Sequence, residues 1–463
     1  MKKRQVGIPH LDKRSSVAMA IALFVIILSG SDMVILSTAS VTMISDIGGK
    51  NLYSLLFSVR GITDVISCLL CGRLIDRLGR RNILIFSLTL QILCDCTAAL
   101  ATGMTAMIAS RFFYGISHGL ILSATMIMIN ELFAEKSGYG YLIMLLGYGA
   151  GNIILPLFSG WLIEQISWRI CFAAVVVFAS VGLILVARNC PNYCIDTPEN
   201  STDFTGAALT FIWLSILVVI LTFGGDLFLW TSVTAYVLTI GGLIAFVAFM
   251  HHEKYINQKI AIFPISMLRS KILIGCAFGQ FALSVNSSCL YVYIPYYMQQ
   301  AMRTTATTAG AATSIISFMT TACGAVLLII MAKVQNNSLF GLLTVLGESV
   351  AIVLVYLLLS PTMSIMLLFA LMLFYGLTQS VESYAFTMTM QSRLETADIA
   401  IGTAFIQFVR QLTGTFANAV AAPILKESPS FEVGIKNIFL FAAILTVIGA
   451  VVYSILVPVG KIK

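Results

Sequence analysis

The sequence predicts an all-α integral membrane protein with about fourteen transmembrane helices, and three observations support this fold class. Of its 463 residues, 59% are hydrophobic and only 10% are charged, whereas a typical soluble domain has about 25% charged residues. The mean hydropathy is +0.97, so a water-soluble form would expose a large apolar surface. Apolar runs near the ~20 residues that a spanning helix needs recur along the whole chain.

The apolar runs form two series. Six come first, at 17–39, 52–72, 83–103, 105–127, 139–163 and 170–187. After the polar stretch RNCPNYCIDTPENSTD, eight more follow at 206–224, 229–250, 272–294, 308–332, 339–360, 363–389, 398–424 and 437–460. The first run is too long for a typical signal-peptide core, so we expect an uncleaved helix. The layout predicts an N-terminal six-helix bundle (1–187), a two-helix insert with flanking cytosolic loops (188–271) and a C-terminal six-helix bundle (272–463).

The distribution of basic residues predicts an even number of spans with both termini in the cytosol. Of the 27 Lys and Arg residues, nineteen fall on predicted inner segments, five on outer segments, and three inside helices. Cytosolic loops carry an excess of Lys and Arg. We therefore expect a multi-pass protein of the cell membrane. The net charge of +7 does not indicate a nucleic-acid partner, because the basic residues lie in short loops rather than on one face.

Several functional classes have no support in the sequence. No phosphate-binding loop indicates ATP-driven transport, no nucleophile-elbow or metalloprotease motif indicates an enzyme, and no filter repeat indicates a channel. Cys190 and Cys194 share a loop, but nothing nearby completes a zinc site. We expect no metal, no other cofactor and no enzymatic activity.

The segment GRLIDRLGRRNIL, from Gly72 to Leu84, carries the most specific pattern. Its glycines permit close approach and a turn, and its acid is surrounded by arginines. It resembles the G-x-L-x-D-x-x-G-R-[KR] loop of the major facilitator superfamily. The resemblance implies the major facilitator fold and a loop that latches helix bundles and controls switching between inward- and outward-open states. The loop residues are Gly72, Asp76, Arg77, Gly79, Arg80 and Arg81.

Other segments resemble the drug:proton antiporters of that family. The SDMVI segment has Asp32 where their first helix has an acid, and Arg111 begins a segment similar to R-x-x-Q-G-x-G. The fifth run resembles their G-x₃-G-x₃-G-P-x₂-G-G motif at Gly147, Gly151, Pro156 and Gly160, although Leu155 and Ser159 replace two glycines. Segments 203–206, 253–269 and 410–414 are similar to the fourteen-helix branch. The second-half loop at 332–337 lacks the repeated acid and arginines.

Ionisable residues inside apolar runs are the candidate coupling and substrate residues. A central charge costs roughly 2.5–3.5 kcal/mol on insertion scales, so such residues are usually functional. They are Asp32, Arg60, Asp64, Asp95, Arg111, Glu348, Glu382 and Arg410. A low-dielectric site favours the protonated carboxyl group, which can therefore carry a proton between the two sides. Two alternatives stay open: Arg60 and Asp64, four residues apart, could neutralise each other, and Arg111 could be a fixed partner of Asp32.

Tyrosines at 291, 293, 296, 297, 375 and 384 could line an aromatic cavity for lipophilic cations. For Tyr296 and Tyr297 the sequence favours a belt at the lipid interface.

These observations predict a monomeric, proton-coupled exporter of amphipathic or cationic small molecules that works by alternating access in the lipid bilayer. One alternative is a carrier specific for one metabolite or siderophore. Another is a receptor or scaffold that keeps the fold without transport.

Overall fold

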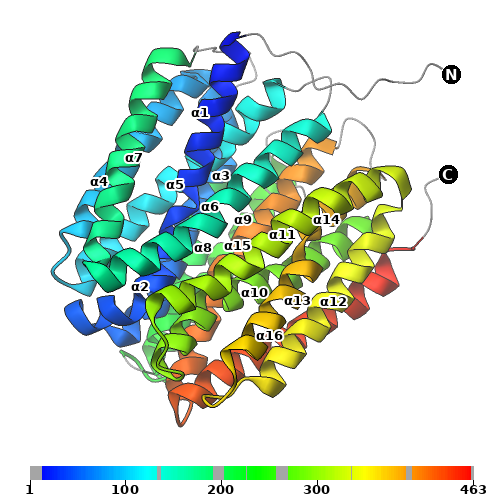
Figure 1. The fold of residues 1–463 in the computed structure, drawn as a ribbon. Coiled ribbons are helices and arrows are strands. Elements are labelled where there is room, and N and C mark those ends of the chain that lie inside the picture. Colours follow the sequence, from blue (N-terminus) through cyan, green and yellow to red (C-terminus); the bar gives the residue numbers. More distant parts are fainter. Residues whose placement is uncertain are drawn as a thin grey trace.

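The computed structural model describes residues 13–132, 137–190, 203–225, 227–256, 270–334, 336–392 and 399–459. These residues form long helices packed side by side (Figure 1). Cys194 and most of the predicted loops flanking the insert lie outside the described residues, as do the side chains of Asp32 and Asp76. Of Gly72 only the helical backbone is described.

The first half contains α1 (Lys13–Ser29), α2 (Ser31–Ile47), a short 3₁₀ helix (Lys50–Leu52), α3 (Tyr53–Leu78), α4 (Arg80–Ala99), α5 (Met104–Leu132), α6 (Ser137–Gln165) and α7 (Trp168–Asn189). Two helices follow, α8 (Phe204–Phe223) and α9 (Val233–Tyr255). The second half contains α10 (Lys271–Gln300), α11 (Ala306–Val334), α12 (Asn337–Leu358), α13 (Ile365–Gln379), α14 (Glu382–Gln391), α15 (Ile399–Glu427) and α16 (Phe431–Leu456).

Twelve helical segments of the described chain are long and apolar enough to cross a membrane. The α1–α2 pair counts as one of them and the α13–α14 pair as another. α3 and α15 have 26 and 29 residues and are not among these twelve. Length and composition therefore give a multi-pass membrane protein with twelve candidate spans.

Two predicted helices, 17–39 and 363–389, are each divided in the structure. The first breaks at Gly30, where a side chain would collide with Asn152 Oδ1 of α6, 2.9 Å from the Cβ position. The second breaks at Ser380–Val381, and there the Ser380 hydroxyl donates a hydrogen bond to the Leu377 carbonyl oxygen over 2.6 Å. Such local bonds compete with the helical ladder. Neither break was predicted from the sequence, because hydrophobicity continues across both.

The helices of each half pack mainly on one another, and the halves meet mainly where α6 packs on α11, α3 on α15, and α2 on α10, with a smaller contact between α2 and α11. α8 contacts both α3 and α15, so it lies along the seam between the halves, and α9 packs mainly on α8.

The two halves are tied together at the end of the bundle remote from the chain termini (Figure 1). The Tyr53 hydroxyl lies 3.4 Å from the Val292 carbonyl oxygen, Ser54 lies 2.9 Å from the Tyr293 hydroxyl, and Gln299 donates to the Thr38 carbonyl oxygen over 2.9 Å. These positions are at the start of α3, toward the end of α10 and, for Thr38, within α2. This end of the interface is therefore closed.

The interface-belt interpretation of Tyr296 and Tyr297 is wrong, because both side chains are completely buried in protein. The Tyr296 ring packs on Tyr53 and on Phe431, with centroid distances of 4.6 and 5.0 Å. Tyr297 stacks on Phe431 at 6.4 Å. Helices distant in sequence cover these rings, so they help close the remote end instead of facing lipid.

Candidate functional site

A cavity of about 380 Å³ lies between the two halves. Its wall includes Gly30, Asp64 and His118 from the first half and Glu382 and Arg410 from the second. Both helix breaks border it, since Gly30 and Ser380 are among the lining residues. Interrupted helices at the midplane are typical of substrate sites in transporters.

Among the side chains that the structure describes in the first half, Asp64 is the acid that lines the cavity. On α3, its Oδ1 atom lies 3.0 Å from His118 Nδ1 of α5. Its Oδ2 atom lies 3.5 Å from Gln411 Nε2 of α15, in the other half. One carboxylate therefore contacts residues of both halves.

Arg60 lies one helical turn before Asp64 and also lines the cavity. Its guanidinium group lies over the Tyr114 ring, 5.5 Å from the centroid. His118 lies within hydrogen-bonding distance of Asp64, so this carboxylate has a neighbour on another helix that the sequence did not indicate. The sequence did not place His118 beside Asp64, because the two residues come from different helices.

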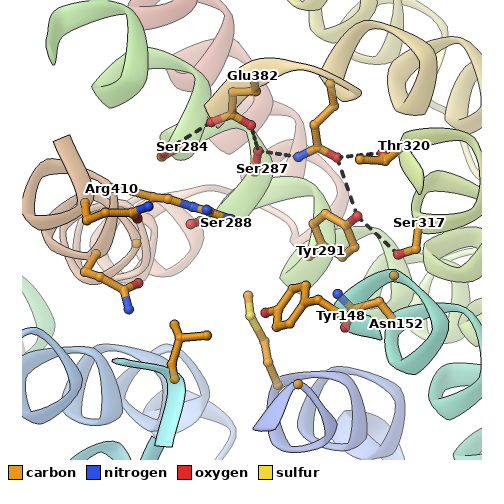
Figure 2. A pocket seen from close by; sticks show the side chains of 18 of the residues that line it. Tyr148, Asn152, Ser284, Ser287, Ser288, Tyr291, Ser317, Thr320, Glu382 and Arg410 are labelled. Atoms are coloured by element: carbon orange, nitrogen blue, oxygen red, sulfur yellow. Dashed lines mark hydrogen bonds between the residues drawn. The ribbon is translucent and has the colours of Figure 1, made fainter. Parts of the chain in front are cut away.

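Glu382 is the acid of the second half, at the first position of α14. Gln280 donates to its Oε1 atom over 2.7 Å, Ser284 reaches the same atom at 3.3 Å, and Ser287 lies 3.4 Å from Oε2. Gln379 donates to Ser287 over 2.7 Å. Figure 2 shows this network at the cavity wall. A carboxyl group held by several neutral donors keeps a fixed position without an ion pair.

The polar residues of α10 form one stripe that sequence reasoning missed. Gln280, Ser284, Ser287 and Tyr291 follow spacings of four, three and four residues, which place them on one helix face. The Tyr291 hydroxyl lies 3.3 Å from Ser317 of α11. The signal was present in the sequence as polar residues at helical spacing within an apolar run.

Glu348 lies behind this stripe and is completely buried. Asn286 Nδ2 donates to its Oε2 atom over 3.2 Å, and the Tyr375 side chain lies nearby. The Tyr375 hydroxyl lies 3.1 Å from Ser287. Glu348 is not among the cavity-lining residues, and polar side chains connect it to Glu382.

Asp95 and Arg111 pair with each other and are also absent from the cavity wall. Arg111 Nη2 lies 3.1 Å from Asp95 Oδ1, with side chains 0% and 2% exposed. The guanidinium group lies over the rings of Tyr114 and Phe172, 4.8 and 5.0 Å from their centroids. The pair joins α4 to α5, which is the arrangement of a structural ion pair.

Of Asp32, the structure describes only the backbone, in the first turn of α2. It lies between Gly30 and Met33, which both line the cavity. Its role remains a prediction, as does the alternative that it pairs with Arg111.

The Gly72–Leu84 segment contains the end of α3 and the start of α4. Gly79, between these helices, has φ +82°, a left-handed conformation that favours glycine. Arg81 donates a hydrogen bond to the Ala187 carbonyl oxygen at the end of α7. Burial raises the pKa of the adjacent Cys190 thiol, and Arg80 and Arg81 oppose that rise. The loop is thus anchored to α7, whereas the latch role of Asp76, Arg77 and the other loop residues remains a prediction.

The small residues of α6 allow close packing on two sides. Side chains at Gly147 and Gly151 would meet Leu23 and Ile27 of α1, and one at Gly160 would lie 2.7 Å from the Thr307 Cα atom of α11. A side chain at Gly310 would lie 2.4 Å from the Pro156 carbonyl oxygen. The predicted motif therefore lies where the first half meets α11 of the second.

Within the described residues, no group of three or more His, Cys, Asp or Glu side chains could hold a metal ion. The site is instead a cavity between two helical halves, with a carboxylate from each.

Comparison with known proteins gives the family. The sequence profile of the Major Facilitator Superfamily matches residues 21–418. The chain belongs to this superfamily.

Among its relatives, the multidrug transporter protein MdtP of Bacillus subtilis is 23% identical over 400 residues, covering 86% of this chain and 73% of MdtP. The multidrug efflux pump SdrM of Staphylococcus aureus is 27% identical over 214 residues, covering 44% of this chain and 47% of SdrM. The match to multidrug resistance protein 3 of Bacillus subtilis covers 55% of that protein. The chain thus spans about half the length of several curated relatives.

Solved structures agree on the fold. A POT family transporter in complex with 5-aminolevulinic acid gives a TM-score of 0.71 at 15% identity, covering 98% of both chains. The nucleoside transporter NupG gives a TM-score of 0.67 at 11% identity, covering 96% of this chain and 100% of NupG. The chain is therefore a multi-pass member of a transporter superfamily with the major facilitator fold, and these relatives are transporters, not enzymes.

Proposed function

We propose that this protein exports amphipathic or cationic compounds in exchange for protons, by alternating access. The observation that supports the proposal is a cavity between the halves to which each half contributes a carboxylate, Asp64 on α3 and Glu382 on α14. The multidrug transporters among its relatives support a broad range of cargo.

The arrangement of the halves supports an inward-open state. The halves are closed at the end remote from the termini, whereas the cavity wall extends to Met388, Gln391 and Gln407. These residues lie at the end of α14 and near the start of α15. With cytosolic termini, this end of the cavity faces the cytosol, where an exporter loads its cargo.

The membrane topology that accompanies this function has fourteen spans. The twelve candidate spans together with α3 and α15 give this number. The helices then divide into bundles over 1–187 and 272–463, with the insert between them. We place the protein in the cell membrane as a monomer with both termini in the cytosol.

Proton exchange would occur at the two cavity carboxyl groups. Asp64 and Glu382 both border the cavity, so protons from water in the cavity can reach them. Protonation of either acid removes a negative charge from the wall and can bias the packing of the two halves. Asp64 is the stronger candidate for linking protonation to the packing of the two halves, because Gln411 of the opposite half contacts it.

Transport in everted membrane vesicles tests the proposal. Vesicles with an acidic lumen should accumulate ethidium, a lipophilic cation, and Asp64→Asn and Glu382→Gln vesicles should not. Accumulation by the wild type that is indifferent to the pH gradient would show that proton coupling is wrong. Full activity of both variants would show that the carboxylates are not the coupling groups.

A further inference from the structure

Arg410 is a cavity residue that the proposed proton exchange does not use. It lies on α15, its side chain is exposed, and it lines the cavity. Figure 2 shows the guanidinium group extended across the space toward Ser288. Among the residues that the structure describes, none forms a hydrogen bond or ion pair with it. Glu382 acts on it electrostatically across the cavity.

The other charged groups that the structure describes at the cavity wall have partners of their own. Asp64 is contacted by His118 and Gln411. Glu382 accepts hydrogen bonds from neutral side chains of α10. Arg60 lies over the Tyr114 ring. Arg410 therefore differs from them in having its donors available to a molecule in the cavity.

A guanidinium group in this position favours an acidic ligand. A charge within a membrane is costly, and arginine presents five donors in a planar fork that matches a carboxylate or phosphate. Neutral hydrogen-bonding groups lie close by: a side chain at Gly414, one turn after Arg410, would lie 3.4 Å from the Ser288 hydroxyl. The wall also includes apolar side chains, such as Met33 and Phe57 from the first half, which can pack on the apolar part of a cargo molecule.

We propose that Arg410 binds an acidic group of the cargo. The cargo class is then amphipathic compounds that carry a carboxylate, sulfonate or phosphate, including zwitterions. This inference rests on the proposed function, because it takes the cavity as the cargo site. It departs from an exporter of cations alone and makes Arg410 a specificity-determining residue.

A matched pair of dyes tests this assignment. A zwitterionic rhodamine with a free carboxylate and its methyl ester, which is only cationic, differ by one methyl group. Binding of each dye to the purified full-length protein in lipid nanodiscs is measured by fluorescence polarisation, without a pH gradient. The wild type should bind the acid about tenfold more tightly, which corresponds to about 1.4 kcal/mol.

Two variants and one control complete the test. Arg410→Gln should lower the affinity for the acid to that for the ester, and Arg410→Lys should keep part of the preference. Arg303→Gln removes the same charge from the α10–α11 connection, outside the cavity wall, and should keep the full preference. Equal binding of the two dyes to the wild type, or an unchanged preference in Arg410→Gln, would overturn the assignment. Because binding is measured without a gradient, the result is separate from a failure of proton coupling.

Discussion

The Nδ1 atom of His118 lies 3.0 Å from Oδ1 of Asp64, and both side chains border the cavity between the halves. Gln411 approaches the other carboxylate oxygen from the opposite half at 3.5 Å. A change in the charge of this one carboxylate therefore acts on contacts within the first half and across the seam. Through Asp64, His118 of α5 is connected to Gln411 of α15 in the opposite half.

Replacing His118 tests that connection. Hydrogen bonds to charged groups contribute about 1.5–3 kcal/mol, so His118→Gln should slow gradient-driven ethidium accumulation by about tenfold, and Asp64→Asn should slow it further. Gln411→Ala should have a smaller effect, because its contact with Asp64 is long. Initial rates in everted vesicles measure all three. A His118→Gln rate equal to wild type would show that the pair is only structural.

Glu382→Gln should separate coupling from passage of cargo. The amide keeps the size of the side chain but cannot release a proton, so uphill accumulation should stop while exchange of labelled ethidium at equal concentrations continues. Ser284→Ala removes one neutral donor that lies 3.3 Å from Glu382. It should lower the free energy of unfolding by no more than about 1 kcal/mol. Measuring uphill uptake and equilibrium exchange in the same vesicles separates proton coupling from passage of cargo. Uphill uptake by Glu382→Gln would show that Glu382 is not needed for coupling.

The buried pair of Asp95 and Arg111 should govern stability. Removing one partner of a buried pair costs about 3–5 kcal/mol, whereas replacing both with apolar residues is often neutral. Asp95→Asn should therefore lower the Tm of the detergent-purified protein, and Asp95→Leu with Arg111→Met should recover much of the loss. If the double variant retains full transport, neither residue is a coupling group. A Tm of Asp95→Asn equal to wild type would exclude the structural role.

Gly160 should tolerate no larger residue. A Cβ atom there would lie 2.7 Å from Thr307 Cα and 2.8 Å from the Ala306 carbonyl oxygen, and such overpacking costs about 1–3 kcal/mol. Gly160→Val should lower the Tm and increase labelling of a cysteine placed at the remote end. Gly241→Val is the control, because nothing lies within 4 Å of that Cβ position. Equal Tm values for the two variants would argue against close packing of α6 on α11.

A disulfide between α3 and α15 should stop transport reversibly. The Cβ position of Gly61 lies 3.1 Å from Thr415 Cβ, and disulfides need about 3.5–4.5 Å, which a small shift provides. With the native cysteines replaced, Gly61→Cys with Thr415→Cys should cross-link on oxidation, lose transport and regain it on reduction. Either single variant serves as control. Unchanged transport in the cross-linked protein would mean that these helices do not separate during the cycle.

Apolar runs and the placement of charged residues were enough to predict a membrane protein built of helices. A spanning segment must satisfy its backbone hydrogen bonds internally and therefore forms a helix. The predicted run 272–294 corresponds to α10, which is longer by six residues at its end. The two helix breaks were not predicted, because hydrophobicity continues across both. The close approach of Asn152 of α6 to the Cβ position of Gly30 is a tertiary contact that the local sequence does not show.

Taken alone, the sequence determined that the protein is helical, lies in a membrane and resembles a transporter family, and it identified the ionisable residues inside its apolar runs. These properties follow from local composition and spacing. Only the tertiary structure divided those residues into cavity-lining Asp64, Glu382 and Arg410, the connected Glu348, and the separate pair of Asp95 and Arg111. The physical reason is that a charge takes its function from its neighbours, and here those neighbours lie on other helices.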